Sequence, residues 1–219
     1  MVQTSLDLIS FGAEGITVHP RPDERHIKRM DVYALRDAVQ TVEFNIEGYP
    51  NQEFLELIKD VKPEQVTFVP DPPEVLTSNA GWRLKGNESI LEKCLALVGE
   101  IDSRSSLFVD PSEITIEELK SFYAMGARRI ELYTEKFSDD FGTPQQDKTV
   151  ELYKKCADQA KEIGFGLNAG HDLNLKNLKA LKQAIPNLDE VSIGHALVCD
   201  ALYLGYKETV TRYLSLLEG

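Results

Sequence analysis

The sequence predicts a single α/β domain, a parallel (β/α)8 barrel of the TIM type from which the first strand is missing. Short apolar strands alternate with helices of similar length, and this pattern is typical of right-handed βαβ units in a parallel sheet. The units follow one another without a break, which favours a barrel over an open sheet. No internal stretch resembles a linker, so we expect the domain to span residues 1–219.

The expected elements leave the barrel with one strand fewer than the eight of a regular (β/α)8 barrel. Seven strands are expected, at 15–19, 42–47, 65–70, 106–110, 129–133, 165–168 and 190–193. Helices are expected between them, with Asn51 capping a helix that runs to about residue 60, and a last helix from 197 to 217. The chain opens on a helix at 2–11, so eight helices face seven strands and no strand precedes the first helix.

Composition excludes several classes of function. The net charge of −12 argues against a nucleic-acid surface, which needs clustered Lys and Arg. No apolar run reaches the roughly 20 residues that span a bilayer, and no secretory leader is visible, so we expect a cytoplasmic protein without a membrane partner. The three cysteines, Cys94, Cys156 and Cys199, are read as packing residues rather than disulfide or zinc ligands.

The four histidines indicate a site. His19, His26, His171 and His195 all fall at or just beyond the carboxyl end of an expected strand. In a parallel barrel these ends converge on one mouth, where the chemistry of such enzymes takes place. A single histidine at a strand end is more often structural, whereas four together favour a functional site.

Carboxylates are expected to join the histidines. Glu47 and Asp110 end their strands, and Glu131 lies inside an apolar strand, where an ionised side chain must point into the barrel or be paired. An ion pair of Glu131 with Arg128 or Arg129 is an equally good interpretation. We expect Glu43 to be solvated or to face a helix.

Small phosphorylated molecules are the expected substrates. The loop 19–26 combines two arginines with two stiffening prolines, which suits anion capture by Arg21; a solvated charged turn is the alternative, favoured for Arg25. Gly194 and His195 lead from a strand into a helix, whose first N–H groups can bind a phosphate. No tight His spacing supports a metal site, so none is expected.

The motifs, taken together and in order, resemble the pyridoxine 5′-phosphate synthase family over nearly the whole chain. They are residues 15–19 continuing to 27, 45–48, 106–110, 130–134, 168–171 and 193–196. The resemblance implies an octameric (β/α)8 enzyme without metal or organic cofactor. It implies the condensation of 1-deoxy-D-xylulose 5-phosphate with 3-amino-2-oxopropyl phosphate to pyridoxine 5′-phosphate, phosphate and water.

The resemblance also implies residue roles. His19 and Glu47 match proton acceptors, His171 matches a proton donor, and Glu131 matches a group that stabilises a transition state. Arg21, His26 and Thr77 match residues that bind the deoxyxylulose phosphate. Gly194 and His195 match residues that bind the phosphate of the other substrate. Asp172, where many members have glycine, lies beside the donor histidine and is also expected to contact substrate. We expect the loop 71–82 to act as a lid.

A second departure concerns the start of the chain. Family members have a first strand and loop whose polar residues contact both substrates, and nothing here precedes the first helix. Either the chain is shortened or its start lies upstream, and we expect little activity until that strand is restored. A metal-dependent sugar-phosphate epimerase or aldolase and an inactive phosphate-binding subunit remain the alternatives.

Overall fold

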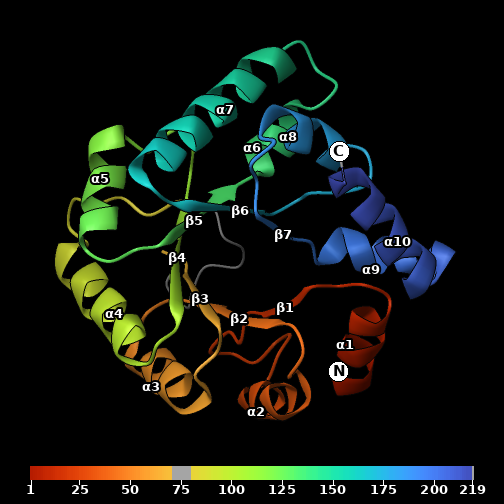
Figure 1. Cartoon of the computed structure of the whole chain (residues 1–219), viewed down its shortest axis with the longest axis horizontal. Coiled ribbons are helices and arrows are strands. Elements are labelled where there is room, and N and C mark those ends of the chain that lie inside the picture. The colour runs from red at the N-terminus through yellow and green to blue at the C-terminus, as the bar shows by residue number, and fades with distance from the viewer. Residues whose placement is uncertain (71–79, 219) are drawn as a thin grey trace.

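A parallel sheet of seven strands forms the centre of the molecule (Figure 1). The computed structural model describes residues 1–70 and 80–218. Within them the strands pair in chain order, so the sheet runs from β1 to β7 without a crossover. The strands are β1 (Gly15–Val18), β2 (Glu43–Gly48), β3 (Gln65–Phe68), β4 (Arg104–Val109), β5 (Arg129–Tyr133), β6 (Gly166–Gly170) and β7 (Glu190–Ser192). The predicted strands are therefore confirmed.

Helices surround the outer face of this curved sheet (Figure 1). They are α1 (Val2–Ser10), α2 (Arg29–Ala38), α3 (Gln52–Val61), α4 (Glu88–Glu100), α5 (Ile116–Ala124), α6 (Glu135–Asp140), α7 (Gln146–Ile163), α8 (Leu178–Ala184), α9 (His195–Leu204) and α10 (Tyr206–Leu217). Asn51 caps α3 as predicted, because its side chain accepts a hydrogen bond from the Phe54 N–H at 2.9 Å. None of the described helices is long and apolar enough to cross a membrane.

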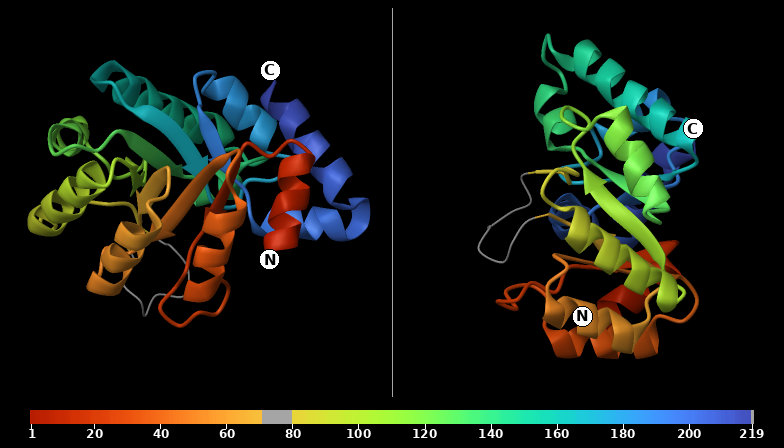
Figure 2. Two further views of the ribbon diagram at one scale, coloured as in Figure 1. Left: turned by 60° about the horizontal axis from the view of Figure 1, so that its bottom comes forward. Right: turned by 90° about the vertical axis from the view of Figure 1, so that its left-hand side faces the viewer.

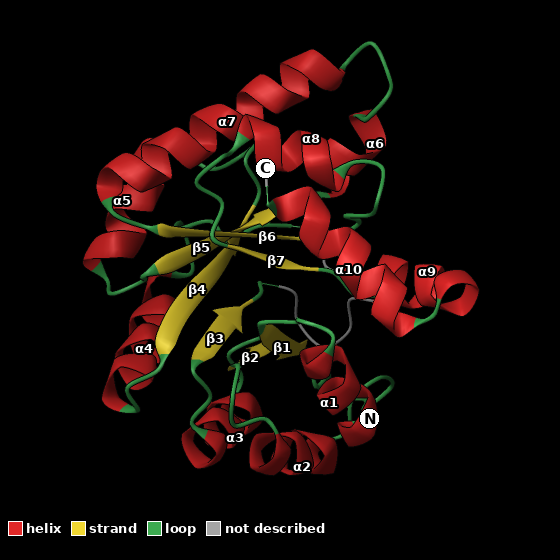
Figure 3. Cartoon of the chain, turned by 45° about the vertical axis from the view of Figure 1, so that its right-hand side comes forward, coloured by secondary structure: helices red, strands yellow, loops and turns green. Residues whose placement is uncertain are grey.

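The predicted single helix over 197–217 was wrong. Gly205, at φ 76°, lies between α9 and α10. This left-handed backbone suits glycine and ends α9. The two helices consequently point in different directions (Figure 3).

The sheet is not closed between β1 and β7, which do not pair within the described residues. Helix α1 contacts both α2 and α10, so the outer ring of helices continues across this opening (Figure 2). The side chain of Thr17 in β1 is exposed as a consequence of the missing neighbour. The architecture is the predicted parallel barrel with one strand position open.

The apolar core lies between the sheet and the helices. Phe44 and Ile46 of β2 point outward and are fully buried, together with Leu35 of α2 and Ile58 of α3. Alternation along each strand then turns the other residues into the barrel. In β2 these are Glu43, Asn45 and Glu47, so the barrel interior is polar.

The cysteines divide into two groups. Cys94 and Cys156 are buried, as predicted for packing residues, and burial raises the pKa of each thiol to about 12. Cys199 is exposed on α9, so its assignment as a packing residue was wrong. Cys199 lies on the exposed part of α9 together with Val198, Leu202 and Tyr203.

Candidate active site

The amino-terminal end of the barrel is filled by an ion-pair network. Arg104 contacts the carboxylates of Glu43 and Glu190, the latter at 2.8 Å. Arg129 lies 3.1 Å from Glu190 and 3.5 Å from Asp189. The expectation that Glu43 is solvated or faces a helix was wrong, because it shares the inner face of β2 with Glu47. Two arginines thus pair with three carboxylates at this end.

Glu131 lies in the middle of the barrel with 2% of its surface exposed. Its Oε2 is 3.5 Å from the Thr67 hydroxyl, which also lies 3.2 Å from Asn45 Oδ1. Arg129 forms its ion pairs elsewhere, so the alternative of a Glu131–Arg129 pair was wrong. Burial, reinforced by the charges of Glu47 and Glu190, raises the pKa of Glu131 well above its usual value. Burial therefore favours the protonated form of this side chain.

His19 and Glu47 meet at the carboxyl ends of β1 and β2. His19 Nδ1 lies 3.8 Å from Glu47 Oε2. Burial lowers the pKa of His19 to about 4, assisted by the cations Arg21 and Arg25 and by His26. Burial raises the pKa of Glu47 to about 7, although Arg21 opposes this shift. The site thus holds a neutral imidazole beside a carboxyl group that exchanges protons near neutral pH.

His171 follows directly after β6. Its ring contacts Tyr133 edge to face, with centroids 4.9 Å apart. The preceding residue, Gly170, lies against Glu131: a Cβ at this glycine would be 2.3 Å from Glu131 Oε1. Close approach of the Glu131 carboxylate to β6 therefore needs glycine at this position. His171 itself has the uncommon φ of 89°.

These contacts form one continuous path across the barrel mouth. His19 reaches Glu47, the charge of Glu47 acts on Glu131, and Glu131 lies on the backbone next to His171. His19 and Glu47 are therefore brought together, Glu131 lies within electrostatic reach of Glu47, and Glu131 packs against the end of the strand that leads to His171.

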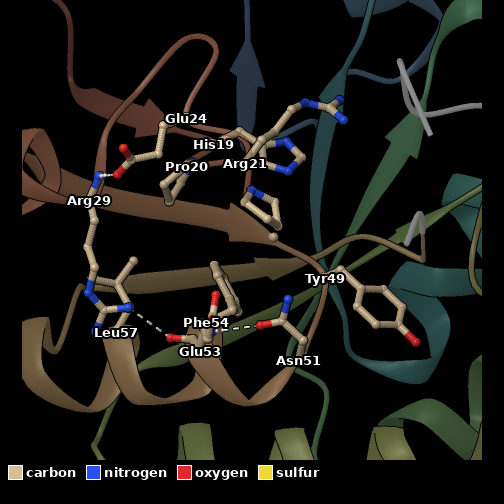
Figure 4. Close-up of a pocket in the computed structure, with 12 residues that line it drawn as sticks. His19, Pro20, Arg21, Glu24, Arg29, Tyr49, Asn51, Glu53, Phe54 and Leu57 are labelled. Atoms are coloured by element: carbon tan, nitrogen blue, oxygen red, sulfur yellow. Dashed lines mark hydrogen bonds between the residues drawn. The ribbon is translucent and has the colours of Figure 1, made fainter. Parts of the chain in front are cut away.

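The loop after β1 forms a pocket of about 130 Å³ with the start of α3 (Figure 4). Its lining residues include His19, Arg21, Tyr49 and Asn51. A hydrogen bond to the start of α2 holds the loop in place: the Arg29 backbone N–H donates to the Glu24 carboxylate at 2.9 Å. Arg21 is close enough to both His19 and Glu47 to influence the pKa of each. An anion bound by Arg21 would lie beside the titrating pair.

His26 and His195 face each other at the open side of the sheet, with ring centroids 6.5 Å apart. Gly194 is the N-cap of α9, and no side chain caps that helix. The N–H groups of its first turn are thus directed toward the neighbourhood of two imidazoles, an arrangement suited to a phosphate. The sequence indicated His26 and His195 as candidates for phosphate binding, but it did not indicate that they lie close together.

Thr77 and most of the expected lid, 71–79, lie outside the described residues. The side chain of Asp172, a predicted substrate-binding residue, contacts His171: its Oδ2 lies 2.7 Å from His171 Nδ1.

Sequence reasoning missed Asn45, Thr67, Tyr133 and Gly170. Asn45 shares the inner face of β2 with Glu47, and Tyr133 shares the inner face of β5 with Glu131. Thr67 pairs with Glu47 across the ladder, and Gly170 pairs with Tyr133. The alternation of side chains along parallel strands is the signal that could have found them. Within the described chain, no group of three His, Cys, Asp or Glu side chains has the geometry to hold a metal ion.

Comparison with known proteins gives one consistent result. The family model described as "Pyridoxal phosphate biosynthesis protein PdxJ" matches residues 1–219. The pyridoxine 5′-phosphate synthase of Phocaeicola vulgatus is 50% identical over 221 residues, covering 100% of this chain and 90% of the relative. The enzyme of the same name from Bacteroides fragilis is 51% identical and covers 97% and 88%.

Solved structures support the fold. A 3-hexulose-6-phosphate synthase superposes with a TM-score of 0.67 at 9% identity, covering 99% of this chain and 94% of the other. Phosphoribosylanthranilate isomerase from Thermotoga maritima gives 0.63 at 14% identity and covers 100% and 94%. At such low identities the likeness concerns the barrel alone.

Proposed function

The chain belongs to the PdxJ family of pyridoxine 5′-phosphate synthases, and we propose that it condenses 1-deoxy-D-xylulose 5-phosphate with 3-amino-2-oxopropyl phosphate. The products are pyridoxine 5′-phosphate, inorganic phosphate and water. The observation that supports this reaction at the proposed site is the path from His19 through Glu47 and Glu131 to His171 around one barrel mouth.

The chemistry of the reaction needs such a set of groups. Imine formation, dehydration and ring closure each move protons between carbon, nitrogen and oxygen. Neutral His19 accepts a proton, and Glu47, with a pKa of about 7, alternates between acceptor and donor. Burial favours the protonated form of Glu131, which can donate a hydrogen bond to negative charge that develops on an oxygen. His171 delivers a proton from the opposite side of the mouth.

The two phosphate groups require separate anchors. Arg21 and His26 are proposed to hold the phosphate of the deoxyxylulose substrate, together with Thr77 from the loop outside the described residues. Gly194 and His195 are proposed to hold the other substrate's phosphate at the start of α9, where the helix dipole favours an anion. These local donors offset the net charge of −12.

Product formation tests the proposal. The purified chain is incubated with both substrates, and pyridoxine 5′-phosphate and phosphate are quantified by mass spectrometry and a phosphate assay. Equal amounts of the two products, unaffected by a chelator, are expected. A version with a strand and loop added before residue 1 is assayed in parallel, because β1 and β7 leave a strand position open. Turnover abolished by the chelator would indicate the metal-dependent alternative, and calorimetric binding without any product would indicate a binding subunit.

We also propose that the protein is a homo-oligomer. Helix α9 presents Leu202 and Tyr203 at 80% and 91% exposure, with Val198 at 48% beside them. Apolar residues gathered in this way on one helix are characteristic of an interaction surface. A second copy of the chain is the proposed occupant, and light scattering measures the assembly.

A further inference from the structure

We propose that Asp172 is a positioning residue for His171: its carboxylate fixes the imidazole in the tautomer that leaves Nε2 to exchange protons with the substrate. The inference rests on the proposed function, in which His171 donates a proton. It gives Asp172 a role that differs from direct contact with the substrate.

The hydrogen bond between the two side chains defines the tautomer. Asp172 Oδ2 lies 2.7 Å from His171 Nδ1, within the range of a charge-assisted hydrogen bond. An ionised carboxylate only accepts hydrogen bonds, so the proton is on Nδ1. In the neutral ring Nε2 then carries the lone pair, and in the imidazolium Nε2 carries the proton that can be delivered.

The backbone holds the carboxylate in place. Asp172 has φ 57°, a left-handed conformation that aspartate tolerates better than most residues. Its carbonyl accepts hydrogen bonds from Ser138 Oγ at 3.0 Å, Asn177 Nδ2 at 3.1 Å and Asn174 Nδ2 at 3.2 Å. Three donors on one carbonyl fix the peptide that carries the side chain. Strained backbone held by its surroundings in this way is characteristic of functional sites.

The surroundings of the ring favour a single orientation. Tyr133 lies against it at an interplanar angle of 83°. The Tyr133 hydroxyl donates to Glu135, and burial raises the pKa of that phenol, so it stays neutral. The Thr134 hydroxyl donates to the Gly170 carbonyl at 2.7 Å. In the described part of the chain, the hydrogen bond observed at the His171 imidazole is the one with the Asp172 side chain.

The imidazole tautomer tests the inference without any turnover. In protein with nitrogen-15 labelled histidine, at a pH where the rings are neutral, NMR distinguishes Nδ1–H from Nε2–H. The chain has four histidines, so the His171 signals are identified by their loss in His171→Gln. We expect Nδ1–H in the parent chain and in Asp172→Asn, whose amide oxygen still accepts, and mainly Nε2–H in Asp172→Gly.

Both substitutions suit the left-handed backbone, because asparagine and glycine adopt positive φ readily. Asp172→Gly is expected to lower kcat roughly 10- to 100-fold with little change in KM, since a general acid contributes about 10²- to 10⁴-fold and this one becomes misoriented. Asp172→Asn is expected to lose less. Asp139→Asn removes an exposed carboxylate from nearby α6 and is the matched control, with kcat unchanged.

Contrary results are distinct from a failure of the proposed function. An Nε2–H tautomer in the parent chain, or a tautomer unchanged in Asp172→Gly, would overturn the inference. So would full kcat in Asp172→Gly. A parent chain that forms no pyridoxine 5′-phosphate but shows the Nδ1–H tautomer, lost in Asp172→Gly, would refute the proposed reaction and leave the positioning of His171 supported.

Discussion

His19 Nδ1 lies 3.8 Å from Glu47 Oε2, yet the two side chains do not form a stable ion pair at neutral pH. Burial and the neighbouring arginines hold the pKa of His19 at about 4, so its imidazole is neutral. Burial holds the pKa of Glu47 at about 7. A proton acceptor and a group that titrates near pH 7 therefore lie side by side, which is what repeated proton transfer requires.

The pH dependence of turnover should report Glu47. As a proton acceptor Glu47 must be ionised, and with a pKa of about 7 it is protonated at lower pH. We expect kcat/KM to fall with decreasing pH through about 7, approaching tenfold per unit below it. Initial rates of product formation from pH 5.5 to 8.5 measure this, and a profile that stays flat down to pH 5.5 would exclude Glu47 as the acceptor.

The same carboxyl group should affect stability. Its pKa is about 7 in the folded chain and about 4.5 when unfolded, so the folded state favours the protonated form. This contribution is complete below pH 4.5 and is lost as the pH rises to 7, a difference of about 1–3 kcal/mol. Glu47→Gln should therefore raise the melting temperature at pH 8 but not at pH 4.5. Glu92→Gln, at an exposed site, is the control, and equal effects of both variants would contradict the expectation.

Gly170→Ala should displace Glu131. The new methyl group would lie 2.3 Å from Glu131 Oε1, so the carboxylate or β6 must move, at a cost of about 1–3 kcal/mol. We expect lower thermal stability and lower kcat. Gly99→Ala is the matched control, because no atom lies within 4 Å of its new Cβ and alanine favours a helix. Identical behaviour of the two variants would show that the contact is unimportant.

Thr67→Val should disturb Glu131 without changing the shape of the barrel. It removes the hydroxyl that lies 3.2 Å from Asn45 Oδ1 and 3.5 Å from Glu131 Oε2, leaving buried polar groups without that partner. The expected cost is about 1–3 kcal/mol in urea unfolding, with reduced kcat. Thr67→Ser keeps the hydroxyl and should retain most activity. If serine loses as much activity as valine, the hydroxyl alone does not account for the role of Thr67 and the expectation fails.

Leu202→Glu should weaken self-association. The side chain is 80% exposed on α9, and a charge there is unfavourable in an apolar contact. Light scattering at several concentrations should show smaller assemblies than for the parent chain. Met30→Glu changes another exposed residue, 74% accessible on α2, and should leave the assembly intact. A parent chain that is monomeric at all concentrations would remove the basis of this expectation.

The sequence predicted the barrel and the mouth because both follow from periodic patterns. Each strand could be located from its apolar residues, and parallel strands place His19 and His171 at the same end. Glu43 was misassigned although strand alternation puts it on the face of Glu47. The break at Gly205 also had a signal, since glycine often ends a helix.

Other features could not be read from local patterns. The proximity of His26 and His195 depends on how the first and last units face each other across the open strand position. The bond between Asp172 and His171 depends on two consecutive left-handed residues, held by carbonyl contacts from α6 and the start of α8. Such contacts arise only when distant segments pack together.

The most direct test of the shared site compares the kinetics of Glu47→Gln, His171→Asn and the corresponding double variant. The rate is measured as pyridoxine 5′-phosphate formed in a single turnover. If the two residues serve one sequence of proton transfers, each single variant should lose about 10²- to 10⁴-fold, and the double variant little more than the weaker single one. Losses that multiply would show that the residues act independently, and a single variant with the parent's rate would place its residue outside the reaction.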